Sequence, residues 1–320
     1  MPYRNLFTST VSVLALTSML ALPPAFAQET SQPPTAQTNE AVSEGVRDEA
    51  TAQIDERRQK LLDDATRALE ETETASTTLD EDDTEAALEA LAVATGKLQS
   101  VVARDPSLAL APVDVRLLQR DLLGDVETIE ASREVIEDLV ADGRLQEARP
   151  LMREFASEIV IETTNLPLAT YPDALLRATA QIDAGEIETA KQTLETALGT
   201  LVITEEVIAL PVLRAQLLID AAEEALAEME ESTGDADASA VEDAVESAEP
   251  EPISPGEYVA AARSQLKIAE ALGYGEEGDF EELHDNLDEL DEKIDLADNT
   301  GGIFDRIGDS FIRLKQRLFD

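Results

Sequence analysis

Residues 273–278 carry the sequence feature that most resembles a chemical motif. They read GYGEEG, which matches the Gly-x-Gly-x-x-Gly fingerprint of dinucleotide-binding proteins. That fingerprint works between a strand and a helix, where the helix N-terminus meets a pyrophosphate. Here the hydrophobic pattern predicts a helix before the motif, and Glu276 and Glu277 would repel a phosphate. We therefore expect a glycine that ends a helix, followed by a loop.

The histidine and the clustered acids give no recognisable metal or catalytic site. His284 is the single histidine and there is no cysteine, so a triad or a zinc site lacks partners. The acids at 80–83 and the Asp235/Asp237 pair lack the alternating ligands, central glycine and distal glutamate of a calcium hand loop. We expect no catalytic residue, no dedicated metal site and no cofactor, and hence no enzyme; weak divalent cation binding stays open.

The elements that would position any site come from a unit that recurs after about forty residues. Gly143 precedes a helix, a β-branched run at 159–161 and a proline, and Gly185 precedes the same order with a run at 201–203. Such a unit cannot bury its own apolar face, so copies must stack. We expect a mainly α protein, a bundle of stacked helix-hairpin repeats, in which the two runs pair as one short two-stranded β element.

Composition and charge limit the class of protein. The chain is 43% hydrophobic but only 3% aromatic, which is typical of a helical core built from Leu, Ala, Val and Ile. It has 24 basic against 69 acidic residues, so its surface repels nucleic acid and anionic lipid. The acidic bias fits adaptation of the surface to high salt, or binding of a cation or a basic partner.

Changes in amino-acid composition along the chain predict its domain organisation. Residues 11–22 are apolar and residues 25–27 read AFA, the pattern of a cleaved signal peptide, which places the protein in the periplasm of a bacterium. Between Arg214 and Arg263 there are fourteen acids and no basic residue. We expect a signal peptide at 1–27, a flexible linker at 28–45, an accessory helix and polar break at 46–83, a helical domain at 84–300 with a disordered acidic loop at about 228–255, and an amphipathic C-terminal helix at 301–320.

Within the helical domain, residues 84–101 and 113–141 show helical spacing of apolar residues, and the segment 108–112 resembles a degenerate first copy of the extended piece. Residues 280–294 form a heptad seam of Phe280, Leu283, Leu287, Leu290 and Ile294. The C-terminal helix is locally basic and could close the core of the protein or touch a partner or a membrane.

Three stretches resemble the YfdX family of exported proteobacterial proteins: residues 163–172 (TTNLPLATYP), residues 200–215, and residues 262–275, which end in ALGYG. The resemblance covers roughly residues 84–295. It implies a mostly helical periplasmic domain linked to stress responses. Chaperone-like, ligand-binding behaviour has been proposed for members of this family, and no enzymatic activity is established for it. The N-terminal helix and the acidic loop depart from the family pattern.

These observations lead to a functional hypothesis with one alternative. We expect a non-catalytic periplasmic stress-related module that binds a small ligand or holds protein clients. The alternative is a scaffold that forms a homo-oligomer through the heptad seam and the C-terminal helix. The proline-bearing links between the repeats are the predicted contact positions, because we expect residues 165–172 to be exposed: Leu166, Pro167, Leu168, Tyr171, Pro172, Leu210, Pro211 and Leu213.

Overall fold

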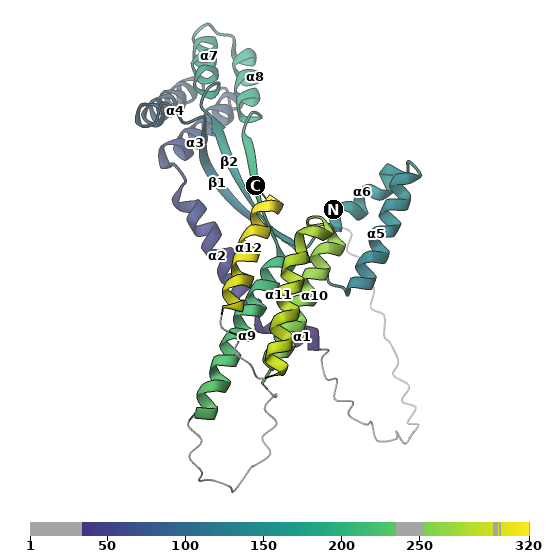
Figure 1. The fold of residues 1–320 in the computed structure, drawn as a ribbon. Coiled ribbons are helices and arrows are strands. Elements are labelled where there is room, and N and C mark those ends of the chain that lie inside the picture. Colours follow the sequence, from purple (N-terminus) through teal and green to yellow (C-terminus); the bar gives the residue numbers. More distant parts are fainter. Residues whose placement is uncertain (1–33, 235–251, 297–299, 301, 320) are drawn as a thin grey trace, which may run out of the picture. The chain divides into compact units, whose positions relative to one another are not determined.

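The structure is a computed structural model that describes residues 34–234, 252–296, 300 and 302–319 (Figure 1). The predicted signal peptide at 1–27 and most of the predicted acidic loop, with Asp235 and Asp237, lie outside these residues. Within them the protein is mainly helical with one small antiparallel sheet, as predicted. The elements in chain order are α1 (Pro34–Ala41), α2 (Ser43–Gln59), α3 (Asp63–Asp80), α4 (Thr84–Arg104), β1 (Leu110–Arg120), α5 (Val126–Ala141), α6 (Leu145–Glu154), β2 (Glu158–Pro167), α7 (Tyr171–Asp183), α8 (Ile187–Leu198), β3 (Val202–Ala209), α9 (Leu210–Gly234), α10 (Pro255–Leu272), α11 (Glu277–Asp295) and α12 (Ile303–Phe319).

Three consecutive units share one architecture, an αα-hairpin followed by a strand: α3–α4–β1, α5–α6–β2 and α7–α8–β3. Each hairpin turns through one residue of left-handed backbone, Asp82, Gly143 or Gly185, with φ of 61°, 73° and 78°. In all three turns this residue donates its N–H to the carbonyl three residues back, and the next residue donates to the carbonyl five back. The predicted repeat is confirmed, and its degenerate first copy proves to be complete.

The sheet has three strands in the order β1-β2-β3, all antiparallel, where two strands were predicted. The helix predicted over 113–141 is wrong in its first part, because residues 110–120 form β1. Ala111, Val113 and Val115 are buried at every second position, the period of a strand, and β1 pairs with the whole of β2. The helical spacing read from Val115 onward arose by coincidence, and the helix itself begins at Val126.

The N-terminal part is more ordered than the sequence indicated. Residues 34–45, predicted as linker, lie in α1 and α2, and Val42 and Val46 are buried. The polar break predicted at the end of the 46–83 segment is helical to Asp80. The hydroxyls of Thr72, Thr74, Thr77 and Thr78 each donate to the carbonyl four residues earlier, so the helix satisfies them internally.

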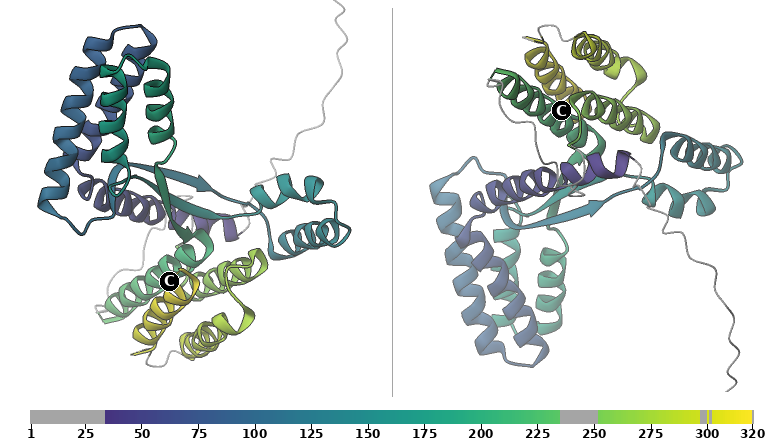
Figure 2. Two further views of the ribbon diagram at one scale, coloured as in Figure 1. Left: turned by 90° about the horizontal axis from the view of Figure 1, so that it is seen from above. Right: turned by 90° about the horizontal axis from the view of Figure 1, so that it is seen from below.

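The buried side chains form separate clusters around the repeats. The α7–α8 hairpin packs on the α3–α4 hairpin, an arrangement visible in Figure 1. The helix α2 covers one face of the sheet together with the start of α9, and Figure 2 shows it along the strands. The helices α9, α10, α11 and α12 form a third cluster, which α1 joins.

The C-terminal helices account for the heptad seam. Phe280, Leu283, Leu287 and Leu290 are buried in the cluster with α9, α10 and α12. The C-terminal helix presents Ile303, Ile307, Phe311 and Leu314 to the same cluster, so it closes the core of its own chain. The helix α9 continues to Gly234, so residues 228–234, predicted as the start of the acidic loop, are helical.

Among the described residues one helix, α4, is long and apolar enough to cross a membrane. Ala87, Leu91, Ala94 and Leu98 of this helix are fully buried in the cluster with α3, α7 and α8. A core helix of a folded domain meets the same criterion of length and composition, and α4 is such a core helix.

Candidate functional site

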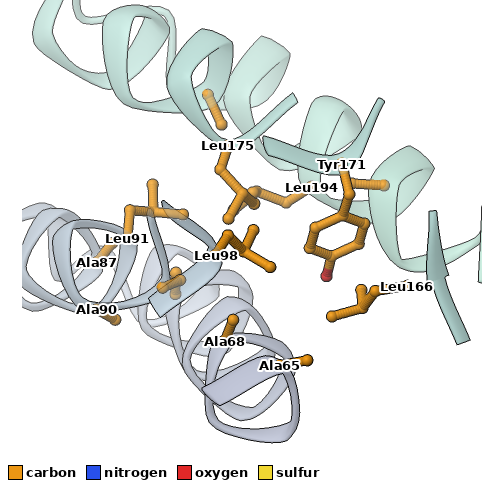
Figure 3. Close-up of a cluster of buried hydrophobic side chains, with 14 of the residues drawn as sticks. Ala65, Ala68, Ala87, Ala90, Leu91, Leu98, Leu166, Tyr171, Leu175 and Leu194 are labelled. Carbon is orange, nitrogen blue, oxygen red and sulfur yellow. The ribbon is translucent and has the colours of Figure 1, made fainter. Parts of the chain in front are cut away.

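The predicted contact positions in the first link belong to the core. Leu166 and Tyr171 are fully buried and Leu168 nearly so, while Pro167 and Pro172 are half-buried. The prediction that residues 165–172 form an exposed link is therefore wrong. The first part of this segment ends β2 in register with β1, and the Tyr171 ring fills the space between two hairpins (Figure 3).

The second link is buried as well, in a different cluster. Leu210 and Leu213 pack with the sheet and α2, and Pro211 is buried at the start of α9. The structure thus does not bring the two predicted links together as one surface. Apolar residues beside prolines are equally typical of contacts inside a protein, and the sequence pattern did not separate the two cases.

The chemical motifs considered from the sequence have structural explanations. Gly273 ends α10 with φ of 83° as predicted, and it precedes a helix without a strand before it. The Nε2 atom of His284 lies 3.0 Å from Glu270 Oε1 in a half-buried pair. Asp83 caps α4 by accepting from the Ala86 N–H at 3.0 Å. In the described part of the chain no three His, Asp or Glu side chains converge on a place for a metal ion.

A pocket of about 440 Å³ lies where the α2–α3 junction meets the end of α4 and the start of β1. Volumes of about 300–1,000 Å³ are typical of small-molecule sites. We call it the junction pocket, and its lining comprises Lys60, Leu61, Leu62, Asp63, Val101, Arg104, Asp105, Leu108 and Pro112.

Local backbone geometry fixes the walls of the junction pocket. The helix α2 ends at Gln59, and Leu62 is extended, with φ of −101° and ψ of 105°, before α3 begins. The Leu62 N–H donates to the Pro112 carbonyl at 3.0 Å, and the Thr66 hydroxyl donates to the Val113 carbonyl at 3.1 Å. These two bonds hold the junction against β1. Three of the apolar lining residues, Leu62, Val101 and Leu108, also pack with the core cluster of the α3–α4 and α7–α8 hairpins.

Charged side chains line the rim of the junction pocket. Asp64 accepts from Lys97 Nζ at 2.8 Å and from an Arg104 guanidinium nitrogen at 2.9 Å, so it ties the arginine to α3. The hydrogen bond from Lys97, with the charges of both cations, lowers the pKa of Asp64. At the next residue after Arg104, the Ser107 hydroxyl and backbone N–H donate to Asp105, and these hydrogen bonds lower its pKa. The rim therefore carries fixed charges of both signs around apolar walls.

Sequence reasoning missed the junction pocket for a structural reason. Its residues come from two segments, 60–63 and 101–112, which meet because α3 and α4 pack as a hairpin and the start of β1 bonds to the α2–α3 junction. The segment at 108–112 was recognised as an extended piece with a proline. That segment was the one part of the pocket that the sequence indicated. Because a helix was wrongly predicted after it, β1, whose Pro112 lines the junction pocket, was not recognised.

A second polar arrangement connects the sheet to the C-terminal helices. Asp121 accepts from the Arg214 guanidinium at 3.0 and 2.5 Å and from the Ser157 hydroxyl at 2.8 Å. Burial alone would raise the pKa of Asp121, but the hydrogen bonds and charge of Arg214 outweigh it and lower the pKa. Every group here is engaged with a neighbour, so the arrangement is a structural tie between β1, β2 and α9.

The fold and the site together define a class of protein: a mainly helical protein of tandem hairpin–strand units, with a pocket at the edge of its first unit. The family model described as YfdX protein matches residues 68–207. This match confirms the resemblance drawn from the sequence, and it covers most of the three units, from within α3 to within β3. The similar string at 262–275 lies outside the matched residues.

Among solved structures, a crystal structure of Salmonella Typhi YfdX is similar to this chain. The two are 12% identical with a TM-score of 0.33, over 47% of this chain and 93% of that one. A likeness at this level carries no argument about function. No curated protein sequence matches the chain.

Proposed function

We propose that this protein is a non-catalytic, exported binding protein whose ligand is a small amphipathic molecule held in the junction pocket. The observation that carries the proposal is the pocket itself, with its volume of about 440 Å³, its five apolar lining residues and its charged rim. Apolar walls with a few fixed polar groups are the usual composition of small-molecule sites. Export to the periplasm rests on the leader sequence at 1–27, and a link to stress responses rests on the YfdX family region.

The lowered pKa values of three aspartates agree with a binding role without catalysis. Catalysis needs a nucleophile, base or acid that converges on one reacting atom. In the described part of the chain, Asp105 at the pocket rim, Asp64 behind Arg104 of the rim and Asp121 in the tie have lowered pKa values, because hydrogen bonds to neighbours hold their carboxylates. The rim then serves to orient a charged end of the ligand while the leucines bury its apolar part.

The scaffold alternative has less support. Its two predicted contact elements, the heptad seam and the apolar face of α12, pack against each other and against α9 and α10 in one chain. An oligomer built on these elements would need to open that cluster, at a cost of many buried apolar contacts.

A titration with 1-anilinonaphthalene-8-sulfonate, an amphipathic anion, tests the proposed function. We expect saturable fluorescence enhancement that Leu108→Trp weakens at least about tenfold, because the larger ring fills the pocket. Val102→Trp is the matched control, since Val102 is the neighbour of Val101 on α4 and lies exposed outside the pocket. Equal loss in both variants, or no loss in Leu108→Trp, would refute the pocket as the binding site.

A further inference from the structure

The strand β3 forms one edge of the sheet. The strand order β1-β2-β3 places β2 on one side of β3, and no strand of the described chain lies on its other side. The register between β2 and β3 runs from Val202 to Ala209 without a bulge, and the strand sequence VITEEVIA contains no proline. Residues 202–205 are exposed. A regular, accessible edge strand can accept a further strand through its backbone hydrogen-bonding groups.

One hydrogen bond shows which backbone groups of β3 point away from β2. The Leu210 N–H donates to the Ser157 carbonyl at 2.9 Å, and this pair continues the register of the two strands. In an antiparallel ladder, hydrogen-bonded pairs alternate with pairs that are not hydrogen-bonded. The even-numbered residues of β3 therefore bond to β2, whereas Ile203, Glu205 and Val207 direct their N–H and C=O groups toward the free edge.

The side chains of these three residues lie on the face of the sheet that α2 does not cover. Ile208 of β3 and Ile159 of β2 pack in the cluster with α2, and side chains alternate between the two faces along a strand. Ile203 is 59% exposed and Glu205 is exposed, whereas Val207 is half-buried. A strand added at this edge therefore meets an apolar, an acidic and a second apolar side chain at every second position.

Glu205 faces a second glutamate across the ladder. Its register partner is Glu162 of β2, in a pair that is not hydrogen-bonded, the kind in which opposite side chains lie closest. Like charges directly opposite each other destabilise a sheet. Neither glutamate has an ion pair within the described residues, and Arg116, which is opposite Glu162 on β1, bonds to Asp114 at 3.0 Å instead. The open face thus carries unbalanced negative charge beside the free edge.

We propose that the free edge of β3 binds an extended peptide segment of a partner protein as a fourth, antiparallel strand. The segment has a lysine or arginine opposite Glu205, and apolar residues two positions before and after it, opposite Val207 and Ile203. The cation lies beside the two glutamates and relieves their repulsion. Backbone hydrogen bonds to the three outward-facing residues hold the segment in register.

Charge argues against a second copy of this chain as the occupant of the edge. Two β3 strands that pair antiparallel through all three outward-facing residues bring Glu205 opposite the partner's Glu205, and like charges in that position repel. The whole chain has a formal net charge of −45, which adds repulsion between copies. The same charge attracts a basic segment.

Fluorescence polarisation of the labelled peptide TVTRTVT with the full mature chain tests the proposal. We expect saturable binding with a dissociation constant of about 10–500 μM at low salt. The peptide TVTETVT should bind about tenfold more weakly, because its glutamate lies opposite Glu205.

Backbone methylation of the peptide separates strand pairing from attraction by net charge. A methyl group on the arginine backbone nitrogen keeps the charge but removes the N–H that donates to the Glu205 carbonyl, and we expect about a tenfold loss of affinity. A methyl group on the nitrogen of the next threonine is the matched control and should leave the affinity unchanged, because that N–H points away from β3. These peptides need no variant of the protein, so they test the proposal even if a variant unfolds.

A charge reversal on the protein tests the assigned position. Glu205→Lys should bind TVTETVT about tenfold more tightly than TVTRTVT, the reverse of the wild-type preference. Glu134→Lys, at an exposed acid on α5, changes the net charge by the same amount and should keep the wild-type preference. Circular dichroism checks that both variants are folded.

Four results would overturn the proposal. The first two are no saturable binding of TVTRTVT to the wild type and equal affinities for the arginine and glutamate peptides. The third is an affinity that methylation of the arginine nitrogen does not change, since attraction by net charge would then explain the binding. The fourth is a dimer in sedimentation velocity that Glu205→Lys abolishes, which would assign the edge to a second copy.

Discussion

The Tyr274 hydroxyl donates to Glu158 Oε2 at 3.1 Å and accepts from the Ser157 N–H at 3.1 Å, across 116 and 117 residues of chain. This contact fixes the α10–α11 turn against the first residues of β2. Gly273 and Gly275 on either side both have positive φ, and a methyl group at Gly275 would come within 2.5 Å of Leu318 Cδ2. The GYG sequence matches part of a nucleotide-binding motif, but its role here is structural: it connects the sheet to the C-terminal helices.

Removing this hydroxyl should destabilise the protein without changing its fold. Tyr274→Phe leaves the Ser157 N–H and one Glu158 oxygen without their partner, so we expect a loss of about 1–2 kcal/mol in the free energy of unfolding. Tyr258→Phe, at a half-buried tyrosine for which the structure gives no hydroxyl hydrogen bond, is the control and should cost less than about 0.5 kcal/mol. Urea unfolding measures both, and equal losses would contradict the role of the contact.

The Asp121–Arg214 pair should contribute stability that depends on pH. Since the folded pKa of Asp121 is lowered, its contribution is fully present above the ordinary aspartate pKa of about 4 and is lost as the pH falls through the lower, folded pKa. Asp121→Asn leaves Arg214 half-buried and unpaired, and we expect a loss of about 2–3 kcal/mol at neutral pH.

The difference between wild type and Asp121→Asn should therefore shrink below about pH 4. Asp114→Asn, in the exposed pair with Arg116, is the control and should cost at most about 0.5 kcal/mol at any pH. A difference between wild type and Asp121→Asn that stays constant on acidification would argue against this account.

Tyr171 should limit stability at alkaline pH. Burial raises the pKa of Tyr171 to about 12, with the nearby Thr72 side chain opposing the rise. Because the pKa of Tyr171 is higher in the folded state, this residue contributes to the free energy of unfolding below the unfolded pKa of about 10. That contribution is lost as the pH rises toward about 12. The wild type should thus lose about 2–3 kcal/mol across this range that Tyr171→Phe does not lose.

At neutral pH the same variant should be neutral or stabilising by up to about 1 kcal/mol. The reason is that the Tyr171 hydroxyl is buried and has no hydrogen-bond partner of good geometry among the described residues. Denaturant unfolding at neutral pH and at about pH 11, where about half of the alkaline loss should be present, measures both effects. A large loss at neutral pH would mean that the hydroxyl is bonded in solution.

The first hairpin turn should accept a stabilising substitution. Asp82 has φ of 61° where the sister turns have glycine. Asp82→Gly removes the strain of a side chain in left-handed backbone, and we expect a gain of about 0.5–1 kcal/mol. Glu81→Gly, one residue earlier with φ of −86°, should instead cost about 0.5–1 kcal/mol. A loss in both variants would show that Asp82 makes a compensating interaction.

The sequence predicted those parts of the fold that depend on local signals. Gly143 and Gly185 marked the hairpin turns because left-handed backbone favours glycine, and the periodic stripes in 84–101 and 303–318 marked core helices. The first unit was harder to recognise, because Asp82 replaces the glycine and a run of threonines hides the end of α3. The strand β1 was missed because its apolar spacing at 115, 118 and 122 also fits a helix, and only pairing with β2 decides between them.

The candidate site could not be predicted to the same extent. The predicted contact residues, such as Leu166 and Tyr171, were selected as apolar residues beside prolines, and tertiary packing buried them. The junction pocket is made where chain segments about forty residues apart meet, and its residues share no spacing pattern. Single-sequence patterns report periodicity within an element, whereas a pocket depends on how elements pack.

Hydrogen–deuterium exchange of the full mature chain with and without 1-anilinonaphthalene-8-sulfonate tests the binding site most directly. We predict that the added ligand slows exchange in peptides covering residues 60–63 and 101–112, which line the junction pocket, and leaves α5 and α6 unchanged. Protection confined to the α5–α6 hairpin, or no protection at saturating ligand, would contradict the assignment of this pocket as the site of function.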